Sequence, residues 1–281
     1  MLDFYTSAPA ISRFKKTSSH LLALAFSVYG RLMILEILEW CLTPASLRAR
    51  TSGLLGEQIA IRHRALRCQG SWQSHLQASK AFLARNLPQG RHVAVLGSGH
   101  LRDIDLGYLK KMFQHITLVD VVHPVDLRLR ALFSGRRIKL FSEDLSGALH
   151  LENPNSPIVF KKQLDQLLSS VDTLISSCVL TQLALPFLKR WDGHFTDHEI
   201  ALCTSRIRQS HLSMLRSCPC GILITDTARR YGQEAWTPLL ADLDFPVPFE
   251  RWIWDIAPPG EHGLKDRGFE QRQVEGFVFQ P

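Results

Sequence analysis

Two glycines and three acidic residues have a spacing that could bind a nucleotide-like ligand. The turn Gly97-Ser98-Gly99-His100 directly follows an apolar run at residues 92–96. Glycines at such a turn let the backbone approach a ligand where a Cβ atom would clash. Asp120 ends a second apolar run, where an acidic side chain can accept hydrogen bonds from both ribose hydroxyls. Glu143-Asp144-Leu145 follows a third run, where an acid can face the amine of an adenine ring.

Two other interpretations of these residues stay open. The glycines could form a plain tight turn, with Asp120 and Asp144 capping the helices that follow. An NAD-binding reductase is a further alternative, but its G-x-G-x-x-G motif requires glycine where Arg102 stands.

Cysteine and histidine spacing gives no reason to expect a metal site. None of the cysteines forms a C-x-x-C pair, and the twelve histidines show no H-E-x-x-H pattern. Reduced thiols of a cytoplasmic protein are therefore expected. The six cysteines are Cys41, Cys68, Cys178, Cys203, Cys218 and Cys220.

The elements that must position these residues alternate between strand and helix after Gly90. Strands are predicted at residues 92–96, 116–119, 138–141, 171–175 and 221–225, and helices at 104–113, 125–133, 161–169, 180–191 and 196–217. Because parallel neighbours need a crossover, this alternation predicts a doubly wound α/β domain with a parallel sheet. The tail breaks the alternation, with a helix predicted at 233–243 and an antiparallel strand pair at 249–256 and 273–279.

The chain before residue 89 is predicted to be helical throughout. Apolar periodicity indicates helices at residues 20–42, 54–68 and 71–87, which predicts an N-terminal helical cap at 1–88 and a Rossmann-like domain at 89–281. Arg31, Glu36 and Glu39 argue against a transmembrane segment in the first helix, because each central charge costs about 2.5–3.5 kcal/mol in a bilayer. We expect a buried amphipathic helix there, with interfacial membrane contact as the alternative.

Three motifs in succession resemble the cofactor motifs of class I S-adenosylmethionine-dependent methyltransferases. They are Val93-Ala94-Val95-Leu96-Gly97-Ser98-Gly99, then Leu118-Val119-Asp120, then Ser142-Glu143-Asp144-Leu145. The first two, extended to Asp103 and Pro124, also resemble an uncharacterised bacterial branch of that family. The resemblance covers residues 90–281. It implies a Rossmann-like fold with a seven-stranded, mostly parallel sheet whose last strand is antiparallel. The apolar periodicity of residues 1–88 places an N-terminal helical extension before it.

The same resemblance implies S-adenosylmethionine as the cofactor. Gly97 and Gly99 would pass beside its methionine part, Asp120 would hold the ribose, Asp144 and Leu145 would flank adenine, and Ser177 would lie beneath the cofactor. The expected cofactor-binding residues are Gly97, Ser98, Gly99, His100, Asp120, Val121, Asp144, Leu145 and Ser177.

The chain departs from the family pattern at two positions. The family often has an acidic residue where Val95 stands and a third glycine where Leu101 stands. Asp103 or Asp105 could replace the missing acid in holding the methionine ammonium. A non-catalytic binding module that kept the fold is therefore an alternative to an enzyme.

The expected activity is methyl transfer to a small molecule. The N/D-P-P-Y/F motif of amino-group methyltransferases is replaced by Ser176-Ser177-Cys178-Val179. A net charge of +7 with pI ≈ 9.3 keeps an RNA methyltransferase as the alternative. Methyl transfer depends mainly on orientation and needs a base only if the acceptor must lose a proton, so no catalytic residue is assigned.

Three further side chains have two interpretations each. Cys178 is a nucleophile or a buried thiol, with the thiol favoured. His123 is a base or a loop residue beside Pro124, with the loop favoured. His75 reaches the cleft or lies at the edge of the core, with the core edge favoured.

Trp252 and Trp254 should lie on one side of their strand and pack against a helix.

Overall fold

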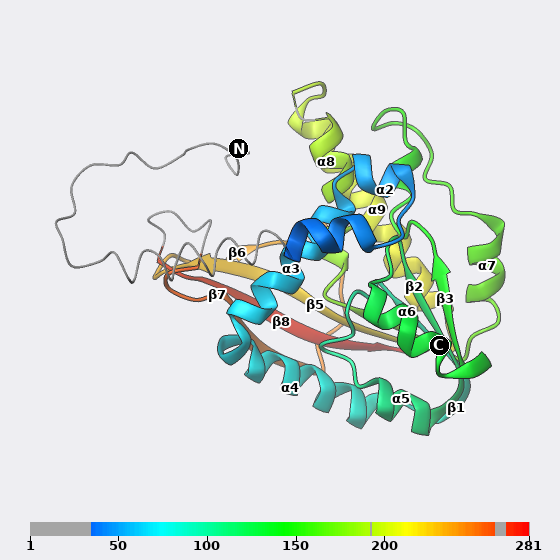
Figure 1. Cartoon of the computed structure of the whole chain (residues 1–281). Coiled ribbons are helices and arrows are strands. Elements are labelled where there is room, and N and C mark those ends of the chain that lie inside the picture. The colour runs from blue at the N-terminus through cyan, green and yellow to red at the C-terminus, as the bar shows by residue number, and fades with distance from the viewer. Residues whose placement is uncertain (1–34, 192, 262–267, 281) are drawn as a thin grey trace.

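A twisted eight-stranded sheet forms the centre of the protein in the computed structural model, which describes residues 35–191, 193–261 and 268–280 (Figure 1). The strand order is β3-β2-β1-β4-β5-β8-β7, with β1 to β5 parallel and β8 antiparallel to both β5 and β7. The eighth strand is a two-residue segment that pairs with β5 off this path and adds one strand to the expected seven. The arrangement otherwise confirms the predicted parallel sheet, its antiparallel closing pair and the fold that the resemblance implies. The strands are β1 (Gly90–Leu96), β2 (Phe113–Asp120), β3 (Ile138–Ser142), β4 (Thr173–Ser177), β5 (Cys220–Tyr231), β6 (Thr237–Pro238), β7 (Glu250–Ala257) and β8 (Glu270–Phe279).

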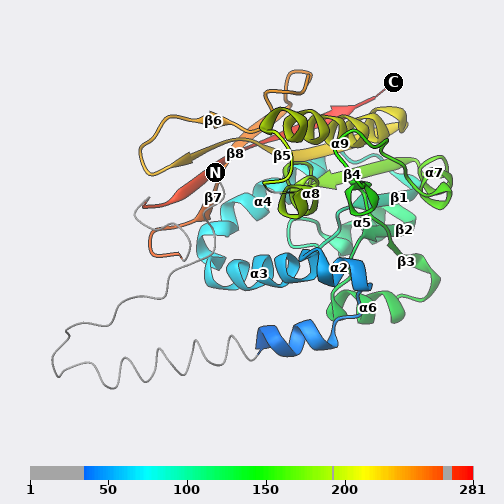
Figure 2. The ribbon, with the colours of Figure 1, turned by 90° about the horizontal axis from the view of Figure 1, so that it is seen from above.

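Helices cover both faces of the sheet (Figure 2), so the parallel strands β1, β2, β4 and β5 are buried on both sides, whereas the edge strand β3 is partly exposed. On β1, Val93 and Val95 enter one core while Ala94 and Leu96 enter the other, as the alternation of a strand requires. The first face packs against α3 (Leu54–Arg67), α4 (Gln69–Asn86), α5 (Leu106–Met112) and α6 (Val125–Leu132). The second packs against α7 (Lys162–Leu168), α8 (Leu185–Trp191) and α9 (Asp197–Ser217). Short turns of helix are α2 (Leu47–Thr51), η1 (Gly135–Arg137), η2 (Ala148–His150) and η3 (Leu180–Gln182).

Helix α4 lies directly against β7 and β8. Phe82 packs so closely over Gly276 that a Cβ atom at Gly276 would come within 2.6 Å of the ring. Both Trp252 and Trp254 of β7 face this helix, as predicted, and Trp72 Nε1 donates a hydrogen bond to the Ile256 carbonyl at 3.0 Å. Helix α4 thus shares a core with the sheet, and the division of the chain at residue 88 stays a prediction.

The helix predicted at 233–243 is wrong. Its central residues Thr237 and Pro238 form β6, which pairs with the far end of β5, and Leu239 N donates to the Thr227 carbonyl at 2.9 Å. Proline lacks the N–H that a helix interior needs, which favours this edge strand. The helix predicted at 180–191 is likewise interrupted, because Pro186 stands in the first turn of α8 and separates it from η3.

Part of the first predicted helix lies outside the described residues. Residues 35–42 are helical, but Leu35, Leu38 and Leu42 are exposed, so the expected burial is wrong for this stretch. Polar contact holds it instead, since Glu39 forms an ion pair with Arg62 of α3 at 2.6 Å. Within the described ranges, no helix has both the length and the apolar character needed to cross a bilayer.

Three fully or nearly fully buried histidines should make stability depend on pH. Burial lowers the pKa of His75 to about 3, and those of His123 and His211 to about 4, from the ordinary value of 6.5. Below pH 6.5 the unfolded chain takes up protons that the folded chain refuses, so each histidine removes up to about 1.4 kcal/mol of stability per pH unit as the pH falls toward its folded pKa.

We therefore expect the free energy of unfolding of the wild type to fall relative to that of a His211→Asn variant between about pH 7 and about pH 5. Asparagine can still bond to Ser176, whose Oγ lies 2.8 Å from His211 Nε2, but it takes up no proton. Urea unfolding of both proteins at each pH measures the difference. Equal pH dependence in the two proteins would show that His211 is not held neutral.

Candidate functional site

The candidate site lies at the carboxyl ends of β1 to β4. Between β1 and β4 the strand order reverses, which is the switch point where open α/β sheets bind ligands. A pocket of about 1410 Å³, open solvent at its mouth included, lies there. Its floor comes from the segments after these strands, at residues 97–103, 120–122, 143–146 and 177–179, and α3 and α4 line it from above.

The glycine turn after β1 fits closely on one side and is open on the other. Gly97 has φ +69°, and a Cβ atom there would lie 2.6 Å from Val179 Cγ2. Gly99 has φ +46°, and a Cβ atom there would meet no described atom nearer than the Gly97 carbonyl oxygen at 4.0 Å. Gly97 is therefore required by packing, whereas Gly99 leaves space where a ligand can approach the backbone. Between them, the buried Ser98 Oγ has no described hydrogen-bond partner.

Leu101, where the family often has a third glycine, has a backbone conformation that glycine adopts without strain. Its φ is +51°, in the left-handed region that costs a non-glycine residue about 1–2 kcal/mol. Its side chain is buried in the core on the α4 and α5 face of the sheet.

Asp120, at the end of β2, holds the glycine turn and faces the pocket. Its Oδ2 accepts a hydrogen bond from Gly99 N at 2.7 Å, Oδ1 has a long contact of 3.4 Å with Val122 N, and the backbone N–H of Val121 also bonds to the carboxyl. Burial raises the pKa of the Asp120 carboxyl, and backbone hydrogen bonds oppose this shift. Val121 also lines the pocket, and so does His100, whose Nδ1 lies 3.7 Å from Asp126 Oδ1 and whose Nε2 has no described partner.

The acidic pair after β3 is already engaged with its own loop. Asp144 accepts hydrogen bonds from Ser146 N at 2.9 Å, Ser146 Oγ at 2.6 Å and Leu149 N at 3.0 Å. Glu143 forms an ion pair with Lys161 at 2.9 Å. Asp144 and the buried Leu145 both line the pocket, and their contact with adenine stays a prediction.

The structure distinguishes between the two acids that could replace the one missing at Val95. Asp103 lines the pocket and accepts a hydrogen bond from Ser177 Oγ, and burial raises the pKa of its carboxyl. Asp105 is exposed and caps α5, accepting from Gly107 N at 2.8 Å and Tyr108 N at 3.1 Å. Only Asp103 is placed to contact a ligand.

Cys178 and His75 lie in the part of the pocket wall that also includes Trp72 and Trp254, which we call its inner end. They do not form a nucleophile pair. Cys178 Sγ lies 3.9 Å from His75 Nε2, and His75 Nδ1 accepts a hydrogen bond from Trp252 Nε1 at 3.0 Å. Because the indole can only donate, the proton of the neutral imidazole is on Nε2, which therefore cannot take a proton from the thiol. Burial also raises the pKa of Cys178 well above its ordinary value. These contacts favour the neutral thiol over the nucleophile.

We expect Cys178 to resist alkylation, since only the thiolate reacts. At about pH 7.5, iodoacetamide should label the exposed Cys41 at least about tenfold faster than Cys178 in the folded protein. Peptide mass spectrometry over a time course measures both rates in one sample. Comparable rates would show an activated thiol and would restore the nucleophile interpretation.

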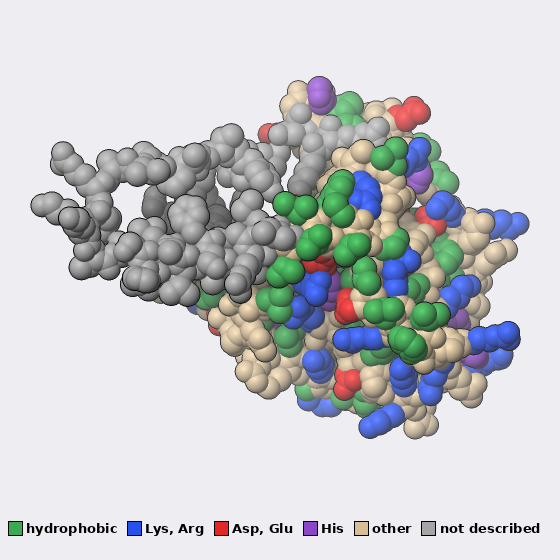
Figure 3. Space-filling view, in the orientation of Figure 1, with side chains coloured by type: hydrophobic (Ala, Val, Ile, Leu, Met, Phe, Trp, Pro, Cys, Tyr) green, Lys and Arg blue, Asp and Glu red, His purple; other side chains and the backbone are tan. Residues whose placement is uncertain are grey.

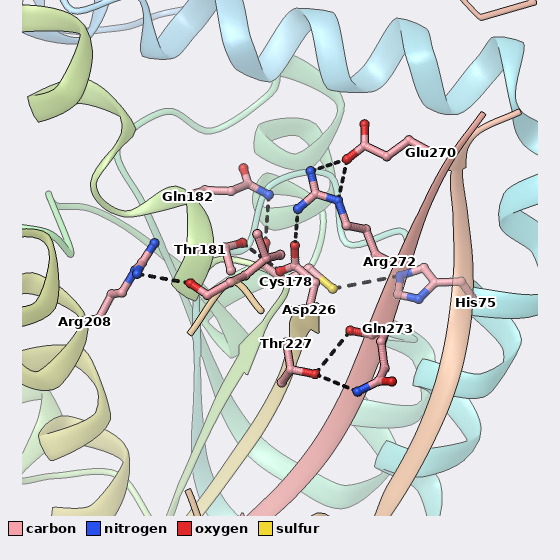
Figure 4. A network of polar contacts seen from close by, with 11 residues as sticks. His75, Cys178, Thr181, Gln182, Arg208, Asp226, Thr227, Glu270, Arg272 and Gln273 are labelled. Atoms are coloured by element: carbon pink, nitrogen blue, oxygen red, sulfur yellow. Dashed lines mark hydrogen bonds and ion pairs between the residues drawn. The ribbon is translucent and has the colours of Figure 1, made fainter. Parts of the chain in front are cut away.

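A polar network that the sequence did not predict fixes the segment around Cys178 (Figure 4). Asp226 of β5 accepts from Thr181 Oγ1 at 2.7 Å and from Arg272 Nη1 at 2.8 Å, and Gln182 Nε2 donates to the Cys178 carbonyl at 2.8 Å. Cys178 itself has φ +52°, so these contacts hold a backbone conformation that its residue type disfavours.

His123 does not take part in the pocket. It is fully buried and is absent from the pocket wall, which favours the loop interpretation over a base. His75, in contrast, lines the pocket, which is the interpretation that the sequence did not favour. The pocket wall also includes four residues that were not predicted as site residues: Arg62, Trp72, Arg102 and Trp254. Among the described residues, no three His, Cys, Asp or Glu side chains gather as a metal site would require.

Comparison with known proteins gives structural similarity only. No family model matches the chain, and no curated protein matches it. Among solved structures, it is similar to the 1,6-didemethyltoxoflavin-N1-methyltransferase of Burkholderia thailandensis, at 14% identity and a TM-score of 0.42 over 85% of this chain and 92% of that one. It is also similar to the N-methyltransferase NodS of Bradyrhizobium japonicum, at 12% identity and a TM-score of 0.34 over 74% and 94%. A S-adenosylmethionine-dependent methyltransferase of Leishmania major shares 12% identity, with a TM-score of 0.36 over 88% and 83%. Since a fold hosts many activities, function depends on the residues of this chain.

Proposed function

We propose that this protein is a S-adenosylmethionine-dependent methyltransferase that acts on a small molecule. The observation that carries the proposal is the pairing of Asp120 with Gly99 at the open side of the turn after β1. There, a carboxylate on the pocket wall lies beside a backbone that leaves room for a ligand. This combination suits a nucleoside whose ribose hydroxyls donate to Asp120.

The other residues of the pocket fit the remaining parts of that cofactor. Glu143, Asp144 and Leu145 would border the adenine, and the Asp103 carboxylate, oriented by Ser177, would hold the methionine ammonium in place of an acid at Val95. When bound, the cofactor supplies a methyl group on a positively charged sulfur. The chain supplies orientation, because its residues offer no free base at the inner end of the pocket.

Two observations support a small acceptor over RNA. Helices α3 and α4 line the pocket from above, with Gln58 Nε2 of α3 donating to the Val122 carbonyl at 2.7 Å, so the site is covered. On the described part of the face in Figure 3, Lys and Arg side chains are scattered among hydrophobic ones and form no continuous basic surface. Cytoplasmic localisation, expected from the cysteines, stays a prediction.

Calorimetric titration of the purified chain with S-adenosylhomocysteine tests the proposal. We expect micromolar affinity and no comparable binding of NAD, because Arg102 stands where a dinucleotide site needs glycine. Absence of binding by the folded protein would refute the proposed cofactor. Binding without methyl transfer to any acceptor in a small-molecule screen would favour the non-catalytic module.

A further inference from the structure

The inner end of the pocket is lined by aromatic side chains that are fixed against one another. His75 of α4 stacks on Trp254 of β7, with ring centroids 4.2 Å apart and an angle of 10° between the planes. Trp72 meets Trp254 edge-on at 4.9 Å and 81°. All three side chains are buried, and all three contribute to the pocket wall. Such surfaces bind flat apolar rings by stacking and edge contact.

Two uncharged hydrogen-bond donors at this end lack a proper acceptor. The Trp252 indole fixes the proton of His75 on Nε2, whose nearest described acceptor is the weak Cys178 Sγ at 3.9 Å. Trp254 Nε1 is buried and has no described partner. Buried donors are almost always paired, so two donors left open beside a pocket point to a bound molecule that accepts from them.

We propose that the inner end binds the methyl acceptor, and that this acceptor is an uncharged aromatic molecule with a carbonyl oxygen or ring nitrogen that accepts hydrogen bonds from His75 and Trp254. The inference rests on the proposed function, since it assigns the acceptor class of the same site. It makes His75 a donor that orients the acceptor. Because its Nε2 already carries a proton, His75 is not the base.

The chemistry of the acceptor follows from this assignment. A lone pair of the acceptor forms the bond to the methyl carbon while the carbon–sulfur bond breaks and its electron pair stays on sulfur. If the attacking atom carries a proton, that proton leaves to water after the transfer. The molecule therefore needs a nucleophilic atom that is reactive without prior deprotonation by the protein.

The test uses two probes of the same shape on protein saturated with S-adenosylhomocysteine. 4-Quinolone carries a carbonyl acceptor, whereas naphthalene has the same bicyclic outline and none. Quenching of tryptophan fluorescence measures both affinities. We expect 4-quinolone to bind at least about tenfold more tightly, because a site built to donate discriminates against a molecule that cannot accept. His75→Phe keeps a flat ring and leaves Trp254 Nε1 as the remaining donor, so it should reduce this preference by at least about threefold while S-adenosylhomocysteine affinity is unchanged.

The control is His115→Phe, which makes the same substitution at an exposed histidine outside the pocket. It should leave unchanged both the preference for 4-quinolone over naphthalene and the affinity for S-adenosylhomocysteine. Nitrogen-15 spectra of the wild type provide a measurement that needs no variant. They should show a bare Nδ1 and a protonated Nε2 on His75, and the Nε2–H signal should move with 4-quinolone and not with naphthalene. Equal affinity for both probes, or a bare Nε2, would overturn this inference and leave the cofactor proposal intact. Failure to bind S-adenosylhomocysteine would overturn the proposed function itself.

Discussion

Asp120→Asn should weaken the binding of S-adenosylhomocysteine by about a hundredfold or more. The asparagine oxygen can still accept from Gly99 N, which the carboxylate does at 2.7 Å, so the turn after β1 should keep its shape. The second atom becomes an amide nitrogen, which cannot accept from a ribose hydroxyl. Each hydrogen bond to a charged group is worth about 1.5–3 kcal/mol, and a factor of ten corresponds to about 1.4 kcal/mol. Loss of two such bonds gives the expected effect.

Asp105→Asn is the matched control for this measurement. Asp105 is an exposed cap of α5 only two residues beyond Asp103, and it makes no contribution to the pocket wall. We expect its calorimetric affinity to equal that of the wild type. If Asp120→Asn bound as tightly as the wild type, the ribose would lie elsewhere, and Asp120 would serve only to hold the Gly99 backbone.

Gly221→Ala should cost about 3 kcal/mol of stability and lower the melting temperature by roughly 10 °C. Gly221 lies in β5, between β4 and β8, and its Cβ atom would come within 2.2 Å of the Leu215 carbonyl oxygen of α9. That oxygen is backbone of a helix whose first turn is fixed by a capping box at Thr196 and Glu199. Both groups are backbone of regular elements, so the contact can be relieved only if β5 and α9 move apart.

The same substitution at Gly56 should have the opposite sign. Gly56 is an exposed residue within α3, and a Cβ atom there would meet no described atom within 4 Å. Replacing glycine by alanine in such a position stabilises a helix by about 0.5–1 kcal/mol. Thermal unfolding of both variants measures the pair. A loss of stability at Gly221 no larger than about 0.5 kcal/mol would contradict the close contact with α9.

The repeating part of the fold could be read from the sequence because local patterns determine it. The apolar runs that became β1, β2 and β4 are buried on both faces, and Thr196 with Glu199 marks the start of α9 unambiguously. The tail was predicted less well. Residues 233–243 are apolar enough to suggest a helix, yet Pro238 and the free edge of β5 favour a short strand, and an edge contact of this kind is not visible in local sequence.

The sequence predicted site residues only where each one directly follows a strand that the sequence also predicted. Gly97, Asp120, Asp144 and Ser177 come together because the carboxyl ends of parallel strands meet at one edge of the sheet. His75, Trp254 and the pair of Asp226 with Arg272 come from segments far apart in sequence, and tertiary packing alone brings them together. The same packing fixes the proton of His75 on Nε2, and the spacing of residues in the sequence could not predict this.

Leu101 has a consequence for the thermodynamics of ligand binding. A glycine at this position would reach φ +51° without strain, but it would also leave the turn free to sample other conformations in the empty protein. Here a buried leucine side chain anchors the turn to the core. Part of the ordering that a ligand would otherwise impose is thus completed during folding, and the entropy lost on binding is correspondingly smaller.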